Sequence, residues 1–130
     1  MGDSVRVRRV IDADTIELDR LDPTGTYPFE RVRLIRISTP ELDDRKRTAR
    51  AAAYAGMRYL KALIVGRQVE VEGDAADKFH RRLARVRVLL STPEGVPEPH
   101  DVETLLVAAG HARWWSDMVR ERREAVHAGR

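Results

Sequence analysis

The sequence predicts an α+β domain that is mainly β, a five-stranded barrel-like sheet with three helices. Two kinds of pattern lead to this fold class. Several short segments alternate apolar and polar residues, as strands with one buried face do, whereas residues 46–65 repeat apolar residues every three or four positions, as amphipathic helices do. The elements follow one another as three strands, a helix, two strands and two helices, an order that favours a closed or nearly closed sheet.

The first three strands are predicted before the long helix. Residues 4–11 alternate as a first strand, residues 12–15 form a tight acidic turn, and residues 16–19 resume the alternation. Two prolines and a glycine make residues 20–28 a loop. Residues 30–37 form the third strand, and a nearby proline ends it because proline cannot donate to a ladder.

The long helix and two more strands fill the middle of the chain. Gly66 is a suitable C-cap for the helix over residues 46–65. The apolar stripe of this helix consists of Ala49, Ala53, Met57, Leu60 and Ile64. Residues 68–72 and 83–90 alternate as the fourth and fifth strands, on either side of a charged loop over residues 73–82.

The last third of the chain holds a turn-rich connection and two short helices. Three prolines and a glycine predict turns over residues 91–100. A helix over residues 101–109, N-capped by its aspartate, and a last helix over residues 116–127, capped by its serine, follow. Trp114 and Trp115 lie between these helices and are expected to be core residues. A five-stranded barrel with a helix between its third and fourth strands is OB-fold-like.

Length and composition describe one globular domain. At 130 residues the chain can bury a real core, so we expect a single domain over residues 1–130. No apolar run approaches the roughly 20 residues that span a bilayer, and the N-terminus has no apolar signal segment, which points to the cytoplasm and away from a membrane partner. The absence of cysteine excludes disulfides, thiolate metal sites and thiol nucleophiles.

The charge of the chain is weakly suggestive of a polyanionic partner. Lysine and arginine number 24 against 21 acidic residues, which gives a net charge of +3. Nearly all the basic residues are arginine, which suits bidentate contacts with phosphate. An arginine-rich genome would produce the same bias, so the charge alone does not decide between the two explanations.

Three charged clusters lie at predicted strand ends or in loops, where functional sites usually sit. They are the acidic turn at residues 12–15, Arg33 with residues 38–41, and residues 77–81. Together they supply the parts for hydrolysing a phosphodiester: oxygen ligands for a hard cation, a carboxylate to activate water, and arginines to stabilise developing charge. Taken singly, each cluster has a plainer explanation as a turn or as a solvated surface charge.

Four motifs, in the same order along the chain, carry a family resemblance between residue 5 and about residue 115. Residues 10–15 (VIDADT) resemble V-I-D-G-D-T, residues 33–41 resemble R-L-x-x-I-D-T-P-E, and residues 77–84 resemble D-K-Y-G-R-x-L-A. Residues 102–112 echo a fourth pattern, N/D-x-x-L-V-x-x-G-x-A. The set resembles the staphylococcal nuclease, or thermonuclease-like, family, which implies an OB barrel and a calcium-dependent nuclease acting on DNA and RNA.

The resemblance also implies a calcium site. Asp14 would bind the cation directly and Thr39 would offer its backbone carbonyl, while Asp12 would lie near the metal without binding it. The family's second aspartate ligand is Ser38 in this sequence, which removes a negative ligand and lowers the expected calcium affinity. Asp43 and Asp44 are close enough in sequence to compensate, or they face solvent.

Catalytic and substrate-binding roles follow from the same resemblance. Glu41 would be the general base for the attacking water, and Arg33 and Arg81 would clamp the phosphate in the transition state. Lys78 and Phe79 would contact the nucleotide.

Two further departures concern the backbone. Ala13 and His80 replace glycines of the family motifs. If both positions need a positive φ, histidine is tolerable there and alanine is strained.

Three functions are compatible with the sequence. The first is a metal-dependent nuclease acting on nucleic acid, expected to be a monomer, and the presence of Arg33, Glu41 and Arg81 supports it. The second is a weakened member of the family that binds nucleic acid or protein without cleaving. The third is an unrelated OB-type single-strand binder, against which the low aromatic content of 5% argues because such binders stack bases on aromatic rings.

Overall fold

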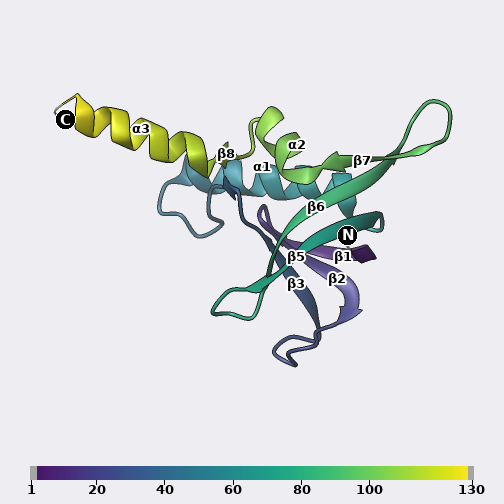
Figure 1. Ribbon diagram of the computed structural model, residues 1–130. Coiled ribbons are helices and arrows are strands. Elements are labelled where there is room, and N and C mark those ends of the chain that lie inside the picture. The colour runs from purple at the N-terminus through teal and green to yellow at the C-terminus, as the bar shows by residue number, and fades with distance from the viewer. Residues whose placement is uncertain (1–2, 129–130) are drawn as a thin grey trace.

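The computed structural model describes residues 3–128 and confirms the five-stranded OB-fold-like barrel (Figure 1). Its strands are β1 (Asp3–Asp12), β2 (Thr15–Leu21), β3 (Phe29–Leu34), β5 (Gln68–Ala76) and β6 (Arg82–Ser91). They pair in the order β3-β2-β1-β5-β6, and a parallel pairing of β3 with β6 closes the sheet. The other neighbours in the barrel are antiparallel.

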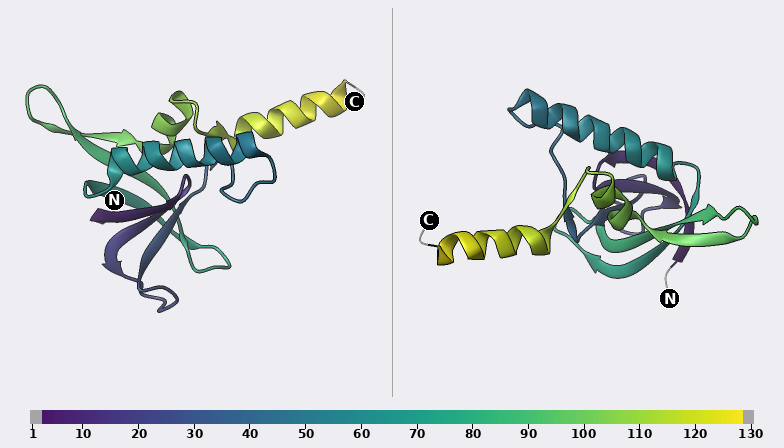
Figure 2. Two further views of the ribbon diagram at one scale, coloured as in Figure 1. Left: turned by 180° about the vertical axis from the view of Figure 1, so that it is seen from behind. Right: turned by 90° about the horizontal axis from the view of Figure 1, so that it is seen from above.

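Alternate residues of these strands fill the barrel. The inward positions are apolar and almost entirely shielded from water, and they include Val7, Ile16, Leu18, Val32, Leu34, Val69, Val71, Val86 and Val88. Helices α1 (Arg47–Ile64) and α2 (Val102–Ala108) lie at one end of the barrel (Figures 1 and 2). Leu60 and Ile64 of α1 and Leu106 of α2 join the same apolar cluster, so the two helices close that end.

The long helix is confirmed, and glycine ends it as the sequence predicts. Gly66 follows the helix with a φ of +77° and donates its N–H to the carbonyl of Val7 at 2.9 Å. Another glycine, Gly56, faces the β1–β2 turn, where a Cβ at this position would stand 3.3 Å from the Cβ of Ala13. Ala13 is buried and is not among the described residues with a positive φ. The backbone strain that a positive φ would impose on this alanine is therefore absent.

The third strand is shorter than predicted. Instead of one strand over residues 30–37, β3 ends at Leu34 and a separate two-residue strand, β4 (Ile37–Ser38), pairs with β8 (Arg113–Trp114). Between them, the N–H of Arg36 donates to the side chain of Glu103 at 2.7 Å rather than to a neighbouring strand. A residue from the far end of the chain therefore interrupts the ladder, which the local pattern does not reveal.

Two other boundaries differ from the prediction. Part of the turn-rich connection is an edge strand, β7 (Pro97–Asp101), which pairs with β6, and prolines are tolerated on an edge. β5 continues through part of the expected charged loop, past an irregularity at Gly73. This glycine has a φ of +136°, and a Cβ there would lie 2.5 Å from the carbonyl oxygen of Leu83, so only glycine fits.

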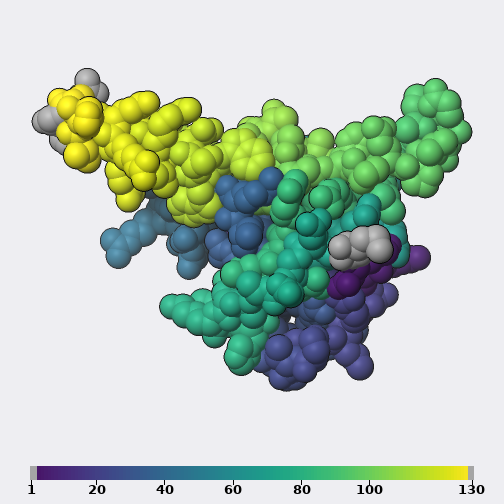
Figure 3. Space-filling model, in the orientation of Figure 1, coloured from purple at the N-terminus to yellow at the C-terminus, as the bar shows by residue number. Residues whose placement is uncertain are grey.

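The two short helices begin differently. Asp101 caps α2 as predicted and accepts the N–H of Thr104 at 3.0 Å. Helix α3 (Trp115–His127) begins one residue earlier than predicted and has no side-chain cap, so the serine cap at Ser116 is wrong. α3 projects from the body of the molecule, as does the β6–β7 hairpin (Figure 3), and none of its residues is buried. Over residues 3–128, no helix combines the length and apolar character that crossing a membrane requires.

Candidate functional site

Strand pairing brings the three charged clusters to one place. Thr15, at the end of the acidic turn, pairs with Arg33, and Arg33 in turn pairs with Leu83 just after the third cluster. The turn is fastened to β3 because the N–H of Leu34 donates to the carbonyl of Asp14 at 2.8 Å. The barrel closure therefore sets the geometry of the site.

A cleft of about 600 Å³ opens at this place, beside the segment that follows β4. Six residues singled out from the sequence line it: Asp12, Asp14, Arg33, Ser38, Thr39 and Glu41. Glu41 is exposed, whereas Asp14 and Arg33 keep only 14% and 30% of their side chains exposed. The cleft thus combines partly shielded charges at its base with an accessible carboxylate.

Asp14 is the most constrained carboxylate of the cleft. It accepts a hydrogen bond from the hydroxyl of Thr15 at 3.1 Å and lies 3.3 Å from the guanidinium of Arg33. Its backbone N–H donates to the carboxylate of Asp12 at 3.0 Å, which holds the two acidic side chains of the turn close together.

Burial raises the pKa of Asp14 to about 7, with further contributions from the hydrogen bond and the negative charge of Asp12, while the charge of Arg33 acts in the opposite direction. For Asp12, burial alone would raise the pKa, but hydrogen bonds to Asp14 and Thr15 and the charge of Arg33 hold it below its ordinary value. Of the two carboxyl groups in the turn, Asp14 is therefore the one whose protonated form the surroundings favour.

This raised pKa predicts how stability depends on pH in the absence of metal. The folded state binds a proton on Asp14 more tightly than the unfolded chain, so the stabilisation is complete below the ordinary value of 3.8 and is lost as the pH rises towards about 7. We expect chemical denaturation in chelator to show that Asp14→Asn gains stability relative to wild type as the pH rises from 3.8 to about 7. Parallel stability profiles of the two proteins would contradict the raised pKa.

Arg81 reaches the site from the other side of the turn. Asp77 holds it, accepting the Nε–H at 2.8 Å and the backbone N–H at 3.0 Å. One terminal nitrogen of Arg81 lies 3.4 Å from the hydroxyl of Thr15, which itself bonds to Asp14. Arg81 is not among the residues that line the cleft, but Thr15 connects it to the residues that do.

Lys78 and Phe79 lie apart from the cleft, on the exposed loop before β6. The ammonium of Lys78 stands 5.2 Å from the centre of the Phe79 ring, and the hydroxyl of Tyr27 donates to the Phe79 carbonyl at 2.8 Å. The next residue, His80, adopts a φ of 63°, the conformation that histidine was expected to tolerate. The Tyr27 hydroxyl thus holds this loop to the 20–28 loop, and the side chains of Lys78 and Phe79 stay accessible.

One residue of the cleft, Trp115, was not expected there, and for a second, Asp43, the sequence left the question open. Trp115 was predicted to be core, but 43% of it is exposed and it lines the cleft, while Trp114 before it is half-buried. Trp114 ends β8 and Trp115 begins α3, and the sequence carries no local signal that tells the two tryptophans apart. Asp43 also lines the cleft, whereas Asp44 accepts the backbone N–H of Lys46.

The donor set of the cleft suits a hard cation held by few protein ligands. In the part of the chain that the structure describes, no three His, Cys, Asp or Glu side chains converge closely enough to form a metal site by themselves. The two carboxylates of the turn, the Ser38 hydroxyl and the Thr39 carbonyl are all oxygen donors, which calcium accepts together with water. Burial and the neighbouring Asp12 raise the pKa of Asp14, and a bound cation would favour its charged form.

The barrel and its cleft define an OB-fold domain with a charged site of carboxylates and arginines. Residues 31–128 match the family described as "Staphylococcal nuclease homologue", and the chain belongs to this family. A thermonuclease of Staphylococcus intermedius is 36% identical over 87 residues, which are 65% of this chain and 49% of the relative. The matched region therefore spans about half the length of that curated relative.

Proposed function

We propose that this protein is a metal-dependent nuclease, with calcium as its cofactor, that hydrolyses phosphodiester bonds of DNA, RNA or both. The proposal rests on one observation above all. A single cleft holds Arg33, Glu41 and Asp14, and Thr15 links Arg81 to the same place. Membership of the staphylococcal nuclease family supports it.

Glu41 is the candidate general base. It is an accessible carboxylate in the same cleft as Arg33, and the described part of the chain offers its side chain no hydrogen bond or ion pair. A water molecule in the cleft can therefore give up its proton to this carboxylate while it attacks phosphorus.

The two arginines are the candidate groups for charge stabilisation. Arg33 is held by Asp14, and Arg81 is held through its Nε by Asp77. Each guanidinium is thereby fixed in direction before substrate binds, and donors fixed in advance stabilise developing phosphoryl charge most effectively. Lys78 and Phe79, accessible on the adjoining loop, are proposed to contact the nucleotide.

The proposed calcium ion would be held by Asp14 and the carbonyl of Thr39, with Asp12 nearby. When bound, it would supply positive charge that offsets the phosphate and its developing charge. Without it, Asp14 and Arg33 already orient each other at 3.3 Å.

Ser38→Asp is expected to tighten calcium binding. Ser38 lines the cleft together with Asp14, and a neutral hydroxyl is a poorer ligand than a carboxylate. A contact worth on the order of 1–3 kcal/mol in a hydrated site should lower the half-saturating calcium concentration roughly tenfold or more. The rate at saturating calcium should change little. Titration of the rate with calcium, with calorimetry beside it, measures both.

Overlaying titration curves would show that position 38 does not face the cation. Ser38→Asn is the matched control, because it has the size of aspartate without its charge. We expect it to shift the half-saturating concentration far less than Ser38→Asp does.

The proposed function is tested by incubating purified protein with single- and double-stranded DNA and RNA, with calcium, with magnesium or with chelator. Degradation is expected with added calcium above magnesium, because an irregular oxygen site suits the strict octahedron of magnesium poorly. A preparation of the Glu41→Gln, Arg33→Ala double variant controls for contaminating nuclease. Equal degradation in excess chelator, or none with any metal up to about 10 mM, contradicts the proposal. Binding of nucleic acid without cleavage would instead indicate the weakened binding module.

A further inference from the structure

Arg36 occupies the break between the barrel and the segment that carries Glu41. β3 ends two residues before it and β4 begins immediately after it. Both of its backbone groups leave the barrel ladder: the N–H donates to the carboxylate of Glu103 at 2.7 Å, and the carbonyl accepts the N–H of Trp115 at 3.0 Å. Hydrogen bonds to Glu103 and Trp115 therefore fix both the N–H and the carbonyl of Arg36.

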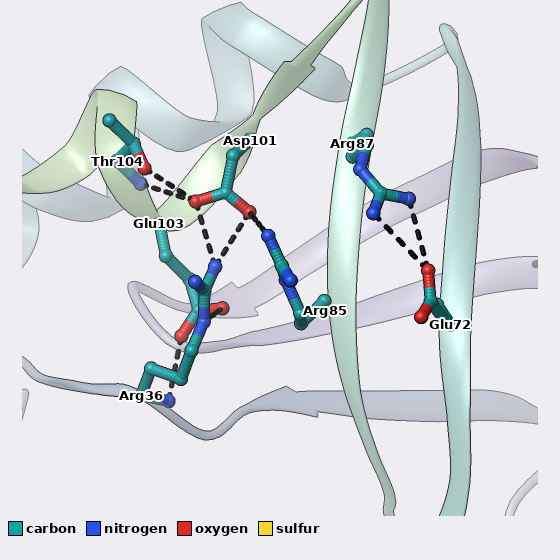
Figure 4. Close-up of polar contacts among 7 residues, drawn as sticks. All are labelled: Arg36, Glu72, Arg85, Arg87, Asp101, Glu103 and Thr104. Atoms are coloured by element: carbon teal, nitrogen blue, oxygen red, sulfur yellow. Dashed lines mark hydrogen bonds and ion pairs between the residues drawn. The ribbon is translucent and has the colours of Figure 1, made fainter.

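The side chain of Arg36 is tied to the start of α2 as well (Figure 4). Its Nε donates to Glu103 at 2.8 Å, and one terminal nitrogen donates to both carboxylate oxygens of Asp101 at 2.6 and 2.7 Å. Asp101 also caps α2 through Thr104, so the same carboxylate fixes the helix start and the arginine. Arg36 and α2 consequently form one connected unit.

The carboxylate of Glu103 is buried and makes both of its hydrogen bonds with Arg36. Its side chain is 0% exposed, and each of its two oxygens accepts one hydrogen bond, both from Arg36. A fully buried carboxylate is costly unless its partners satisfy it, so this pair holds a single geometry.

The segment beyond Arg36 depends on that geometry. Ile37 is buried in the core and β4 makes only two residue pairs, with β8. Farther along, no hydrogen bond or ion pair of the described residues holds the Glu41 side chain, and its carbonyl accepts only the N–H of Asp44, at 3.3 Å. The placement of the Glu41 carboxylate therefore follows the course of its backbone, which leaves the barrel at Arg36 and passes through the β4–β8 pairing.

We infer that Glu103, acting through Arg36 with Asp101, is a positioning group for Glu41. This inference rests on the proposed nuclease function. In this role, a buried carboxylate on α2 holds the proposed general base at the position in the cleft where it can take a proton from the attacking water. A misplacement of about 1 Å can cost on the order of 100-fold in rate.

The test is a double-mutant cycle between Glu103→Gln and Glu41→Gln. Glutamine keeps the shape of Glu103 but turns an N–H₂ group towards one of the Arg36 donors. We expect kcat to fall about tenfold or more with KM little changed. If Glu103 acts through Glu41, the same substitution should cost less than about threefold when Glu41 is already glutamine. If Glu103→Gln lowers kcat by the same factor in wild type and in Glu41→Gln, the inference is overturned, because a general loss of structure would lower kcat in both.

Glu72→Gln is the matched control. Glu72 and Arg87 form a more exposed carboxylate–guanidinium pair at 3.2 Å between β5 and β6 (Figure 4), without touching residues 35–41. This substitution is expected to leave kcat unchanged. A fall in kcat as large as that of Glu103→Gln would overturn the specific role of Glu103.

Hydrogen exchange provides a readout that does not need activity. Peptides covering residues 36–42 should take up deuterium faster in Glu103→Gln than in wild type, while Glu72→Gln leaves them unchanged. Unchanged uptake in Glu103→Gln overturns the inference. If wild type cleaves no nucleic acid with any metal, the proposed function fails, and the exchange result alone decides whether Glu103 fixes this segment.

Asp101→Asn serves if Glu103→Gln does not fold. Asparagine still caps α2, because its side-chain oxygen accepts the N–H of Thr104, but it loses the charge that holds Arg36. A smaller fall in kcat, again absent when Glu41 is glutamine, is expected. A fall of the same factor in both backgrounds overturns the inference.

Discussion

Replacing Arg33 by alanine is expected to lower the rate of nucleic-acid hydrolysis by about 1000-fold, and Arg81→Ala by a comparable factor. Removing one fixed donor that stabilises transition-state charge typically costs 100- to 1000-fold, and arginine contributes a full positive charge as well. The loss should appear mainly in kcat, because charge on the phosphoryl oxygens develops only in the transition state.

Both variants should fold. Arg33 and Arg81 retain 30% and 19% of their side chains exposed, and neither contributes to the apolar cluster in the barrel. Circular dichroism and thermal melts check this. Arg58→Ala, an exposed arginine on α1, is the matched control for charge and should retain the wild-type rate. Rates within a few-fold of wild type for Arg33→Ala, with contaminating nuclease excluded, would remove Arg33 from the mechanism.

Glu41→Gln is expected to lower the rate by about 100-fold or more, the scale on which loss of a general base acts. Glutamine preserves the size of the side chain and cannot accept the proton of the attacking water. Since Glu41 is exposed and its side chain makes no hydrogen bond within residues 3–128, its replacement should not change the melting temperature.

Asp43→Asn separates base catalysis from simple negative charge. Asp43 is an exposed carboxylate that lines the same cleft, two residues after Glu41. At saturating calcium, its replacement should change the rate far less than Glu41→Gln does. Equal losses in both variants would mean that the cleft needs negative charge rather than a base at position 41.

Much of the fold could be predicted because its strands and long helix carry local patterns. The alternation of residues 68–72 and the helical stripe of residues 46–65 arise from burial of one face, which the sequence displays directly. The motifs around Asp14, Arg33 and Glu41 also pointed to residues that share one cleft.

The predictions failed where distant residues intervene. The pattern of residues 30–37 predicts one strand, yet Glu103, 67 positions after Arg36, accepts the N–H that would have continued the ladder. β7 was missed because its prolines signal turns, and only its place at the edge of the sheet makes a strand possible.

The sequence by itself therefore determined the fold class, the order of the barrel strands along the chain and the identities of the charged residues. The tertiary structure decided which of these residues meet. It placed Trp115 in the cleft, connected Arg81 to Asp14 through Thr15, and left Lys78 and Phe79 on a separate loop. The reason is that burial and charge interactions depend on distances in space, and those distances exist only once β3 and β6 close the barrel.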